Sequence, residues 1–184
     1  MGDQSSNERV VIFIDGSNLY HLVKKLVTEK KPNDFDFGKF TRHLAGSRKL
    51  LRTYYYNCPL DRRKDEQAYI KQQKFFDKIQ RIPNFSFVLC RMQKRKSGNL
   101  IVYEAKEDDI HLAVDMVKLA YNDSYDVAIL ISSDGDFVPA VHAVKERGKI
   151  VENVGFENKF SYHLQQTCNK FLKLKKSEME KFFD

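Results

Sequence analysis

Cysteine is scarce in this 184-residue chain, and its three copies match no familiar pattern. Cys58, Cys90 and Cys168 stand far apart, are odd in number and form no CxxC or Cys/His spacing. This arrangement argues against a disulfide framework and against a structural zinc site. We expect all three to be reduced residues in the core or near the surface.

Long apolar segments are also missing. No run approaches the roughly 20 apolar residues that a membrane-spanning helix needs, and 31% of the residues are charged. The first ten residues, MGDQSSNERV, lack the apolar stretch and cleavage site of a secretory signal. These absences predict a soluble, cytoplasmic protein with no membrane partner. The chain has no internal repeat, and its length suits one packed domain.

The net charge of +7 comes from one part of the chain. Residues 48–106 hold 15 basic and 5 acidic side chains, a net charge of +10, whereas the remainder holds 17 basic and 20 acidic, a net charge of −3. A basic segment favours a polyanionic partner such as nucleic acid. A solvated basic surface without such a partner fits the charge equally well.

Apolar runs typical of strands alternate with segments of helical periodicity. This alternation predicts an α/β fold, a single doubly wound domain whose mostly parallel sheet carries helices on both faces. Residues 1–8 are expected to be a flexible N-terminus, 9–156 the domain, and 157–184 a helical extension packed on it. The expected strands are 9–14, 50–57, 85–92, 126–132 and 149–156, with 85–92 and 100–103 forming a hairpin. The expected helices begin near residues 19, 35, 66, 109 and 136.

Aspartates follow the two most apolar strands at the point where each strand ends. Asp15 follows residues 12–14, and Asp134 and Asp136 follow residues 129–131. Open parallel sheets bind ligands at the carboxyl ends of their strands, so these carboxylates converge if the two strands are neighbours. Converging like charges need a cation or a shared proton. Oxygen ligands without nearby His or Cys suit Mg²⁺ or Mn²⁺ rather than zinc.

Each of these aspartates also has a local explanation. Asp15 and Asp134 precede glycines and could be turn residues, and Asp136 could cap the helix that it begins. Asp108 and Asp109 lie in a predicted first helical turn, where acids complement the helix dipole. The repetition of aspartate at the ends of both strands favours a metal site over these separate local roles.

Three ordered motifs resemble the NYN domain, a branch of the PIN-like nucleases, and most closely its bacterial and archaeal LabA-like (DUF88) members. They are Phe13–Tyr20 (FIDGSNLY), Lys106-x-x-Asp109 followed by Asp115, and Ile131–Phe137 (ISSDGDF). The resemblance spans residues 9–156. It implies a sheet of about five parallel strands in the order 3-2-1-4-5, with an Mg²⁺- or Mn²⁺-dependent ribonuclease site at its carboxyl edge.

The resemblance also implies roles for individual residues. By motif position, Asp15 and Asp134 would be central metal ligands, Asp109 and Asp136 supporting acids, and Asp115 a ligand or a group behind the ligands. Family members usually carry a glycine after the lysine of the second motif, where this chain has Glu107 and Asp108, so Asp108 and Asp109 both remain candidates. Residues that would hold water, metal or phosphate are Ser17, Asn18, Ser132 and Ser133.

Under this interpretation the chain hydrolyses RNA. A bound cation would lower the pKa of a water, orient the scissile phosphate and stabilise the leaving oxygen, giving 5′-phosphate and 3′-hydroxyl ends. RNA, single-stranded or structured, is the expected partner, and a homo-oligomer stays an open alternative. Tyr54, Tyr55 and Tyr56 could stack bases where exposed, although at least one should face the core. The expected contacts to the RNA backbone are Arg62, Arg63, Lys94, Arg95 and Lys96.

Two other classes of function compete with this one. The first is an RNA-binding or regulatory NYN-domain protein with little or no catalysis. The second is another phosphotransfer enzyme: a Toprim-type site should have a glutamate where this chain has Asp15, and a receiver-like domain should have an acidic pair on its first strand and a late lysine. Neither of these patterns is clear in the sequence.

Overall fold

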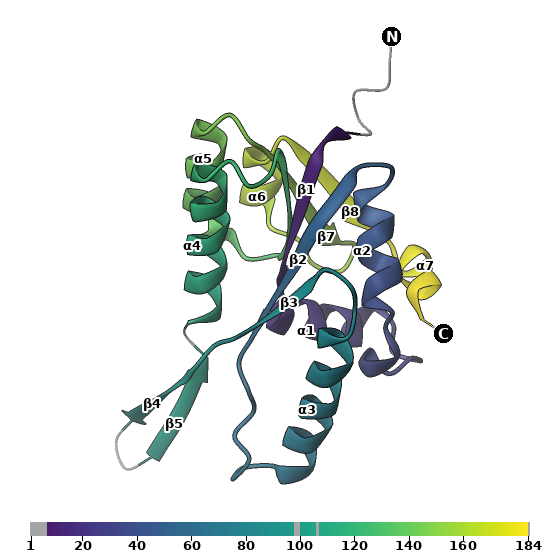
Figure 1. Ribbon diagram of the computed structural model, residues 1–184. Coiled ribbons are helices and arrows are strands. Elements are labelled where there is room, and N and C mark those ends of the chain that lie inside the picture. Colours follow the sequence, from purple (N-terminus) through teal and green to yellow (C-terminus); the bar gives the residue numbers. More distant parts are fainter. Residues whose placement is uncertain (1–6, 98–99, 106, 184) are drawn as a thin grey trace.

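Six parallel strands form the central sheet, in the order β3-β2-β1-β6-β7-β8 (Figure 1). This computed structural model describes residues 7–97, 100–105 and 107–183, with side chains of 92–105 outside the description. The order of the first five strands confirms the expected 3-2-1-4-5 arrangement. The strands are β1 (Arg9–Asp15), β2 (Lys49–Asn57), β3 (Phe85–Leu89), β6 (Val127–Ile131), β7 (Ile150–Phe156) and β8 (Lys170–Leu174).

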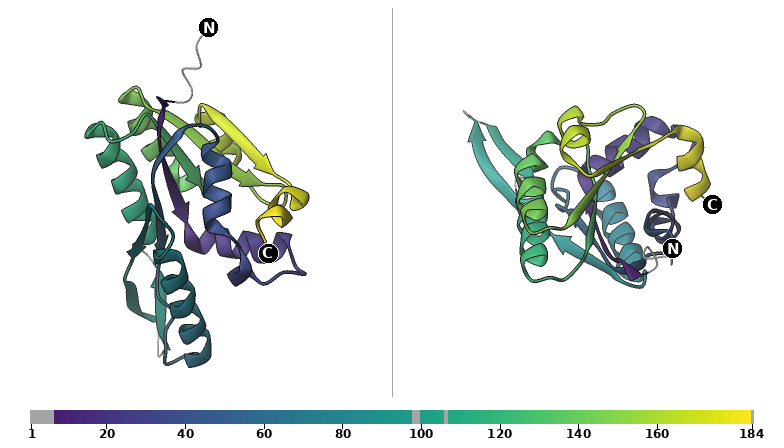
Figure 2. Two further views of the ribbon diagram at one scale, coloured as in Figure 1. Left: turned by 45° about the vertical axis from the view of Figure 1, so that its right-hand side comes forward. Right: turned by 90° about the horizontal axis from the view of Figure 1, so that it is seen from above.

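Helices cover both faces of the sheet (Figure 2). Because side chains alternate along a strand, Ile12 and Ile14 of β1 pack on one face and Val11 and Phe13 on the other. The first face carries α1 (Gly16–Leu26), α2 (Phe37–Ala45), α3 (Glu66–Gln80) and the last turns, α7 (Lys176–Met179) and the 3₁₀ turn Glu180–Phe182. The second carries α4 (Asp108–Tyr121), α5 (Val138–Glu146) and α6 (Tyr162–Thr167). Short 3₁₀ turns at Pro32–Asp34 and Gly135–Phe137 precede α2 and α5.

Two segments differ from the expectation. The strand expected over 85–92 ends at Leu89, and β4 (Met92–Ser97) pairs with β5 (Leu100–Ala105) in a separate antiparallel hairpin. Leu89 is 56% exposed at the sheet edge, so apolar character alone did not mark the end of this strand. The tail contains the expected helices and also β8, whose mixed sequence KFLKL reflects its half-exposed position at the other edge.

Among the described residues, none of the helices combines the length and the apolar character needed to cross a membrane.

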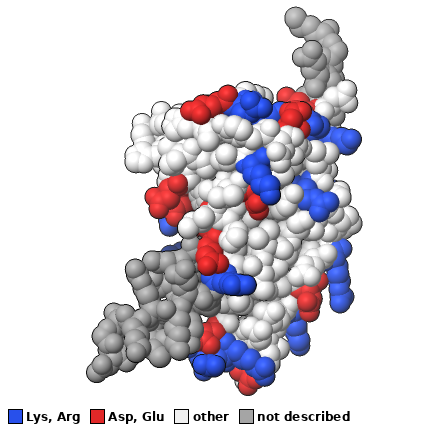
Figure 3. Space-filling view, turned by 60° about the vertical axis from the view of Figure 1, so that its left-hand side comes forward, with Lys and Arg blue, Asp and Glu red and all other residues white. Residues whose placement is uncertain are grey.

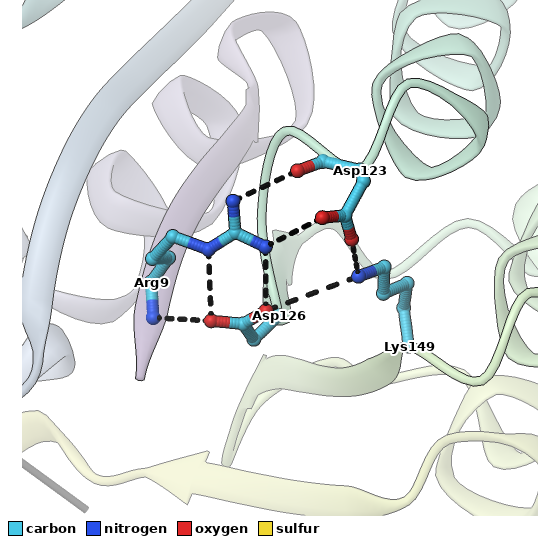
Figure 4. Close-up of polar contacts among 4 residues, drawn as sticks. All are labelled: Arg9, Asp123, Asp126 and Lys149. Carbon is cyan, nitrogen blue, oxygen red and sulfur yellow. Dashed lines mark hydrogen bonds and ion pairs between the residues drawn. The ribbon is translucent and has the colours of Figure 1, made fainter. Parts of the chain in front are cut away.

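Charged side chains tie three strands together at the amino end of the sheet, opposite the expected site (Figure 4). The Arg9 guanidinium donates to the Asp126 carboxylate at 3.0 and 2.8 Å and to the Asp123 carbonyl at 2.8 Å. Lys149 pairs with Asp123 and lies 3.8 Å from Asp126. Because these residues precede or begin β1, β6 and β7, the network aligns the strands that carry the site at their far ends.

Asp126→Asn should lower the melting temperature at pH 7, since hydrogen bonding to Arg9 holds the pKa of Asp126 down at about 2. A carboxylate whose folded pKa lies below its unfolded pKa of 3.8 contributes stability above that unfolded value, and this stability disappears as the pH falls through about 2. Melting curves of both proteins between pH 7 and pH 2 test this. A difference in melting temperature that stays constant down to pH 2 would contradict it.

Candidate active site

The carboxyl ends of β1 and β6 lie side by side, as the interpretation of the sequence requires. Ile14 pairs with Ile131, so Asp15 and Ser132 follow at adjacent positions. The Ser132 hydroxyl donates to Asp15 Oδ2 at 3.0 Å and accepts from the backbone N–H of Asp134 at 3.1 Å. One serine therefore links the ends of both strands.

Asp15 combines a local and an electrostatic role. Its Oδ1 accepts from the backbone N–H of Asn18 at 2.9 Å, which caps α1. The side-chain oxygen of Asn18 in turn accepts from the backbone N–H of Ser133 at 3.2 Å. Asp15 is only 6% exposed, and burial, aided by the negative charges of Asp109 and Asp108, raises its pKa to about 7. The capping hydrogen bond explains why an aspartate stands at position 15. It does not explain why the negative charges of Asp109 and Asp108 lie near it.

Asp109, Asp134 and Asp136 form the other part of this acidic cluster. Partial burial, together with repulsion from Asp108, Asp134 and Asp136, raises the pKa of Asp109 to about 6. Asp134 Oδ1 accepts from the backbone N–H of Asp136 at 3.0 Å, capping the 3₁₀ turn before α5, so Asp134 rather than Asp136 has the capping role. Carboxylates from β1, α4 and the end of β6 therefore influence one another.

The chemistry of this cluster fits a hard divalent cation. Its donors are carboxylate and hydroxyl oxygens, which Mg²⁺ and Mn²⁺ prefer, and the charges that act most strongly on Asp15 and Asp109 are negative. However, no three Asp, Glu, His or Cys side chains are close enough to form a ready-made metal site in the part of the chain that the structure describes. Asp109 and Asp136 are exposed, so side chains of the cluster would have to move closer together to hold an ion.

Asp108 and Asp109 differ in exposure, and Asp115 lies apart from both. Asp108 is 6% exposed in the first turn of α4, whereas Asp109 is exposed but acts more strongly on Asp15. Asp115, two helical turns further along, accepts a hydrogen bond from the Tyr56 hydroxyl at 3.0 Å. Asp115 therefore has a polar partner in Tyr56, but the structure does not bring Asp115 together with the other aspartates.

Gly16 allows α1 to begin directly against β2. A Cβ at this position would lie 2.4 Å from the Tyr55 ring and 2.6 Å from the Tyr56 carbonyl oxygen. Because part of this obstacle is backbone, Gly16→Ala should destabilise the fold by about 1–3 kcal/mol. Gly38→Ala is the matched control, since it lies in α2 with its nearest contact at the end of the Arg42 side chain, 3.2 Å away. Urea denaturation of both variants measures the effect, and equal stabilities would contradict the packing argument.

The serine side chains at this edge already form some hydrogen bonds within the protein. Ser133 donates its hydroxyl to the Lys159 carbonyl at 3.1 Å, so its side chain is already engaged. Below Ser132, the buried Asn153 amide donates to the Leu130 and Ser132 carbonyls at 3.1 and 3.0 Å. Ser17 lines a pocket beside the edge. Of the four residues expected to hold water, metal or phosphate, Ser132 and Asn18 contact other members of the site most directly.

Some basic side chains of residues 48–106 are already paired with carboxylates, so fewer of them than the net charge suggests are free to contact RNA. Arg48 forms a largely buried pair with Glu152 at 2.8 Å, and Arg62 pairs with Glu66 on the surface. Arg63 is exposed in the turn before α3. On the face seen in Figure 3, basic and acidic side chains are interspersed over the described surface. The side chains of Lys94, Arg95 and Lys96 lie outside the described residues.

The tyrosine run of β2 belongs mainly to the interior. Tyr55 and Tyr56 are at most 1% exposed, and Tyr54 stacks on Phe13 with a centroid distance of 5.7 Å. The expectation that at least one tyrosine faces the core is confirmed. Base stacking was expected only of exposed tyrosines, and burial excludes it for Tyr55 and Tyr56, because alternating strand residues face a sheet that is covered on both sides.

A cysteine pair that the sequence pattern did not indicate lies at the same edge. Cys58 and Cys90 follow β2 and β3 directly, and the parallel pairing of Asn57 with Leu89 brings the two thiols together. Burial raises the pKa of Cys58 to about 11 and that of Cys90 to about 12. Thiols with such pKa values are protonated and weakly nucleophilic at neutral pH. All three cysteines are free, as expected.

Comparison with known proteins agrees with this fold and extends to its family. A crystal structure of a protein of unknown function from Vibrio parahaemolyticus matches with a TM-score of 0.64 and 22% identity, covering 95% of this chain and 96% of that one. An uncharacterized protein of Methanocaldococcus jannaschii is 37% identical over 70 residues, which are 38% of this chain and 29% of that protein. The model of the NYN domain matches residues 9–175, and the chain therefore belongs to the NYN domain family.

Proposed function

We propose that this protein is a metal-dependent ribonuclease whose cation is held at the carboxyl edge between β1 and β6. The observation that carries the proposal is the buried Asp15 carboxylate, whose pKa rises to about 7 beside Asp109. A fold keeps an unneutralised carboxylate in such a place at a cost in stability, and functional sites are where that cost is common. Membership of a family of PIN-like nucleases supports the same conclusion.

The protein's own residues would divide the work as follows. Asp15 and Asp134 would hold the cation, with Asp109 and Asp136 completing its oxygen ligands. Ser132 keeps the two strand ends in register through its two hydrogen bonds. When bound, Mg²⁺ or Mn²⁺ activates a water and stabilises charge on the phosphate oxygens. Exposed basic side chains such as Arg63 would contact the RNA backbone, as would Arg62, Lys94, Arg95 and Lys96.

A cleavage assay tests this proposal directly. End-labelled single-stranded and hairpin RNAs are incubated with the protein in Mn²⁺, in Mg²⁺ and in EDTA. We expect cleavage that requires the cation and leaves 5′-phosphate ends. Cleavage that continues in EDTA, or products with 2′,3′-cyclic phosphate ends, would contradict the proposed chemistry.

One observation favours a second candidate, an RNA-binding or regulatory protein with little catalysis. The described carboxylates do not form a ready-made group of three metal ligands, and ligands that must move to bind an ion need not reach a catalytic arrangement. Calorimetric titration with Mn²⁺ beside the cleavage assay separates the two. RNA binding without cleavage of any substrate would favour this second function.

A further inference from the structure

A pocket of about 320 Å³ opens beside the acidic cluster, between α1 and α3. Figure 1 shows α3 extending past the carboxyl edge of the sheet next to α1. The volume lies at the low end of the roughly 300–1,000 Å³ typical of small-molecule sites, which suits one nucleotide. The pocket is lined from α1 by Ser17 and Tyr20, from the end of β2 by Asn57, from the loop after β2 by Leu60, and from α3 by Lys71 and Gln72.

The walls of this pocket are suited to a flat, partly polar ring. Tyr20 and Leu60 remain 38% and 45% exposed, so apolar surface at the pocket is left uncovered. Phe75 and Phe76 lie beneath this surface at 9% and 2% exposure, so Tyr20 is the aromatic ring that remains open to a ligand. Every nucleobase can stack on such rings, and this stacking is a main source of affinity for single-stranded RNA.

Polar groups are placed to meet the edge of a base. The Asn57 side chain bonds to Tyr55, and an amide with two donor hydrogens and one oxygen keeps capacity for another partner. The Gln72 side chain accepts from the Leu60 N–H at 2.7 Å and donates to the Cys58 carbonyl at 3.1 Å. These two bonds hold the loop after β2 against α3 at the pocket.

The pocket is also continuous with the candidate active site. Ser17 lies two residues after Asp15, and the Tyr55 hydroxyl donates to the Gly16 carbonyl at 3.3 Å. The N-terminus of the 11-residue α1 therefore lies between pocket and carboxylates, where helix dipoles attract phosphate. Lys71 adds a positive charge at the pocket itself.

We propose that this pocket binds the base of the RNA nucleotide whose phosphate reaches the aspartate-lined edge. The inference rests on the proposed function, because it takes RNA as the substrate. It adds what the acidic cluster lacks, a means of holding the strand through a base rather than through the backbone. The exposed Tyr20 ring, the free capacity of the Asn57 amide and the positive charge of Lys71 together match a nucleotide better than a purely apolar ligand.

The test uses the full chain in EDTA, so that it does not depend on metal or cleavage. The ¹⁵N-labelled protein is titrated with each of the four ribonucleoside 5′-monophosphates and with ribose 5-phosphate, which lacks the base. We expect at least one nucleotide to shift the amide signals of Tyr20, Asn57 and Leu60, with ribose 5-phosphate binding at least about tenfold more weakly. Equal binding of ribose 5-phosphate, or nucleotide shifts located elsewhere, would overturn the proposal.

Two sets of variants assign the binding to the pocket. Ala68→Trp fills it and should weaken nucleotide binding by at least about tenfold, whereas Ala143→Trp, at a similarly half-buried position on α5 across the sheet, should change it less than twofold. If Ala68→Trp does not fold, Tyr20→Ala replaces it, with Tyr20→Phe as its control. Unchanged affinity in the folded pocket variants would overturn the proposal. RNA cleavage without base binding would overturn the base pocket but not the ribonuclease function. Base binding without cleavage would support the base pocket but not the ribonuclease function.

Discussion

Asp15→Asn should reduce metal-dependent RNA cleavage at least about 100-fold, because the stabilisation that a bound cation gives to the transition state amounts to several kcal/mol. Asparagine keeps the oxygen that caps α1 but loses the charge that would hold the ion. The measurement is the single-turnover rate of cleavage of a labelled RNA in saturating Mn²⁺. Asp34→Asn serves as the control, since it removes an exposed carboxylate from the turn before α2.

The same variant separates loss of activity from loss of structure. Burial and the charges of Asp109 and Asp108 oppose ionisation of Asp15, so a neutral side chain relieves an unfavourable charge. At pH 8 in EDTA, the melting temperature of Asp15→Asn should therefore equal or exceed that of the natural chain. Full activity in Asp15→Asn would remove Asp15 from the reaction. A strongly lowered melting temperature would instead assign it a structural role.

Divalent cations should stabilise the fold much more at pH 8 than at pH 5. The pKa values of Asp15 and Asp109 in the folded chain, about 7 and about 6, lie above the ordinary value of 3.8. At pH values between 3.8 and these folded values, the folded chain therefore binds more protons than the unfolded chain. The stability that these two carboxyl groups contribute by binding protons is fully present below their unfolded pKa, and it is lost as the pH rises through their folded pKa values. For the buried Asp15, this loss is on the order of 4 kcal/mol by pH 8. A cation bound to the ionised carboxylates offsets this loss.

Melting curves with Mn²⁺ and with EDTA at both pH values measure this effect. Taking the difference between Mn²⁺ and EDTA at each pH cancels the titration of groups far from the site. Asp15→Asn should lose most of the Mn²⁺-induced increase at pH 8. An increase that is equal at pH 5 and pH 8, or that persists in this variant, would place the bound cation away from Asp15.

The part of the site that lies on regular strands could be predicted from the sequence. Asp15 and Asp134 follow apolar strands, and parallel strands carry their ends to one edge, so their approach needed only that β1 and β6 be neighbours. The hydrogen bonds that link the two strand ends could not be predicted from the sequence. That Ser132 bonds to both strand ends depends on its side-chain conformation, which spacing alone does not specify.

Features built from distant segments could not be predicted in this way. Cys58 and Cys90 are 32 positions apart, and they meet only because β2 and β3 end in register. The nucleotide-sized pocket similarly requires α1, the loop after β2 and α3 together. At the sheet edges, half-exposed strands such as β8 lose the apolar pattern that identifies central strands, so the tail was expected to be only helical.

A crystal structure with Mn²⁺ tests the central claim most directly, because anomalous scattering locates the ion without reference to activity. The proposed function predicts a peak within coordination distance of Asp15 and of at least one among Asp109, Asp134 and Asp136, with these side chains closer together than they are in the absence of the ion. A peak elsewhere, or none at Mn²⁺ concentrations that support cleavage, would contradict the assignment of this edge as the catalytic site.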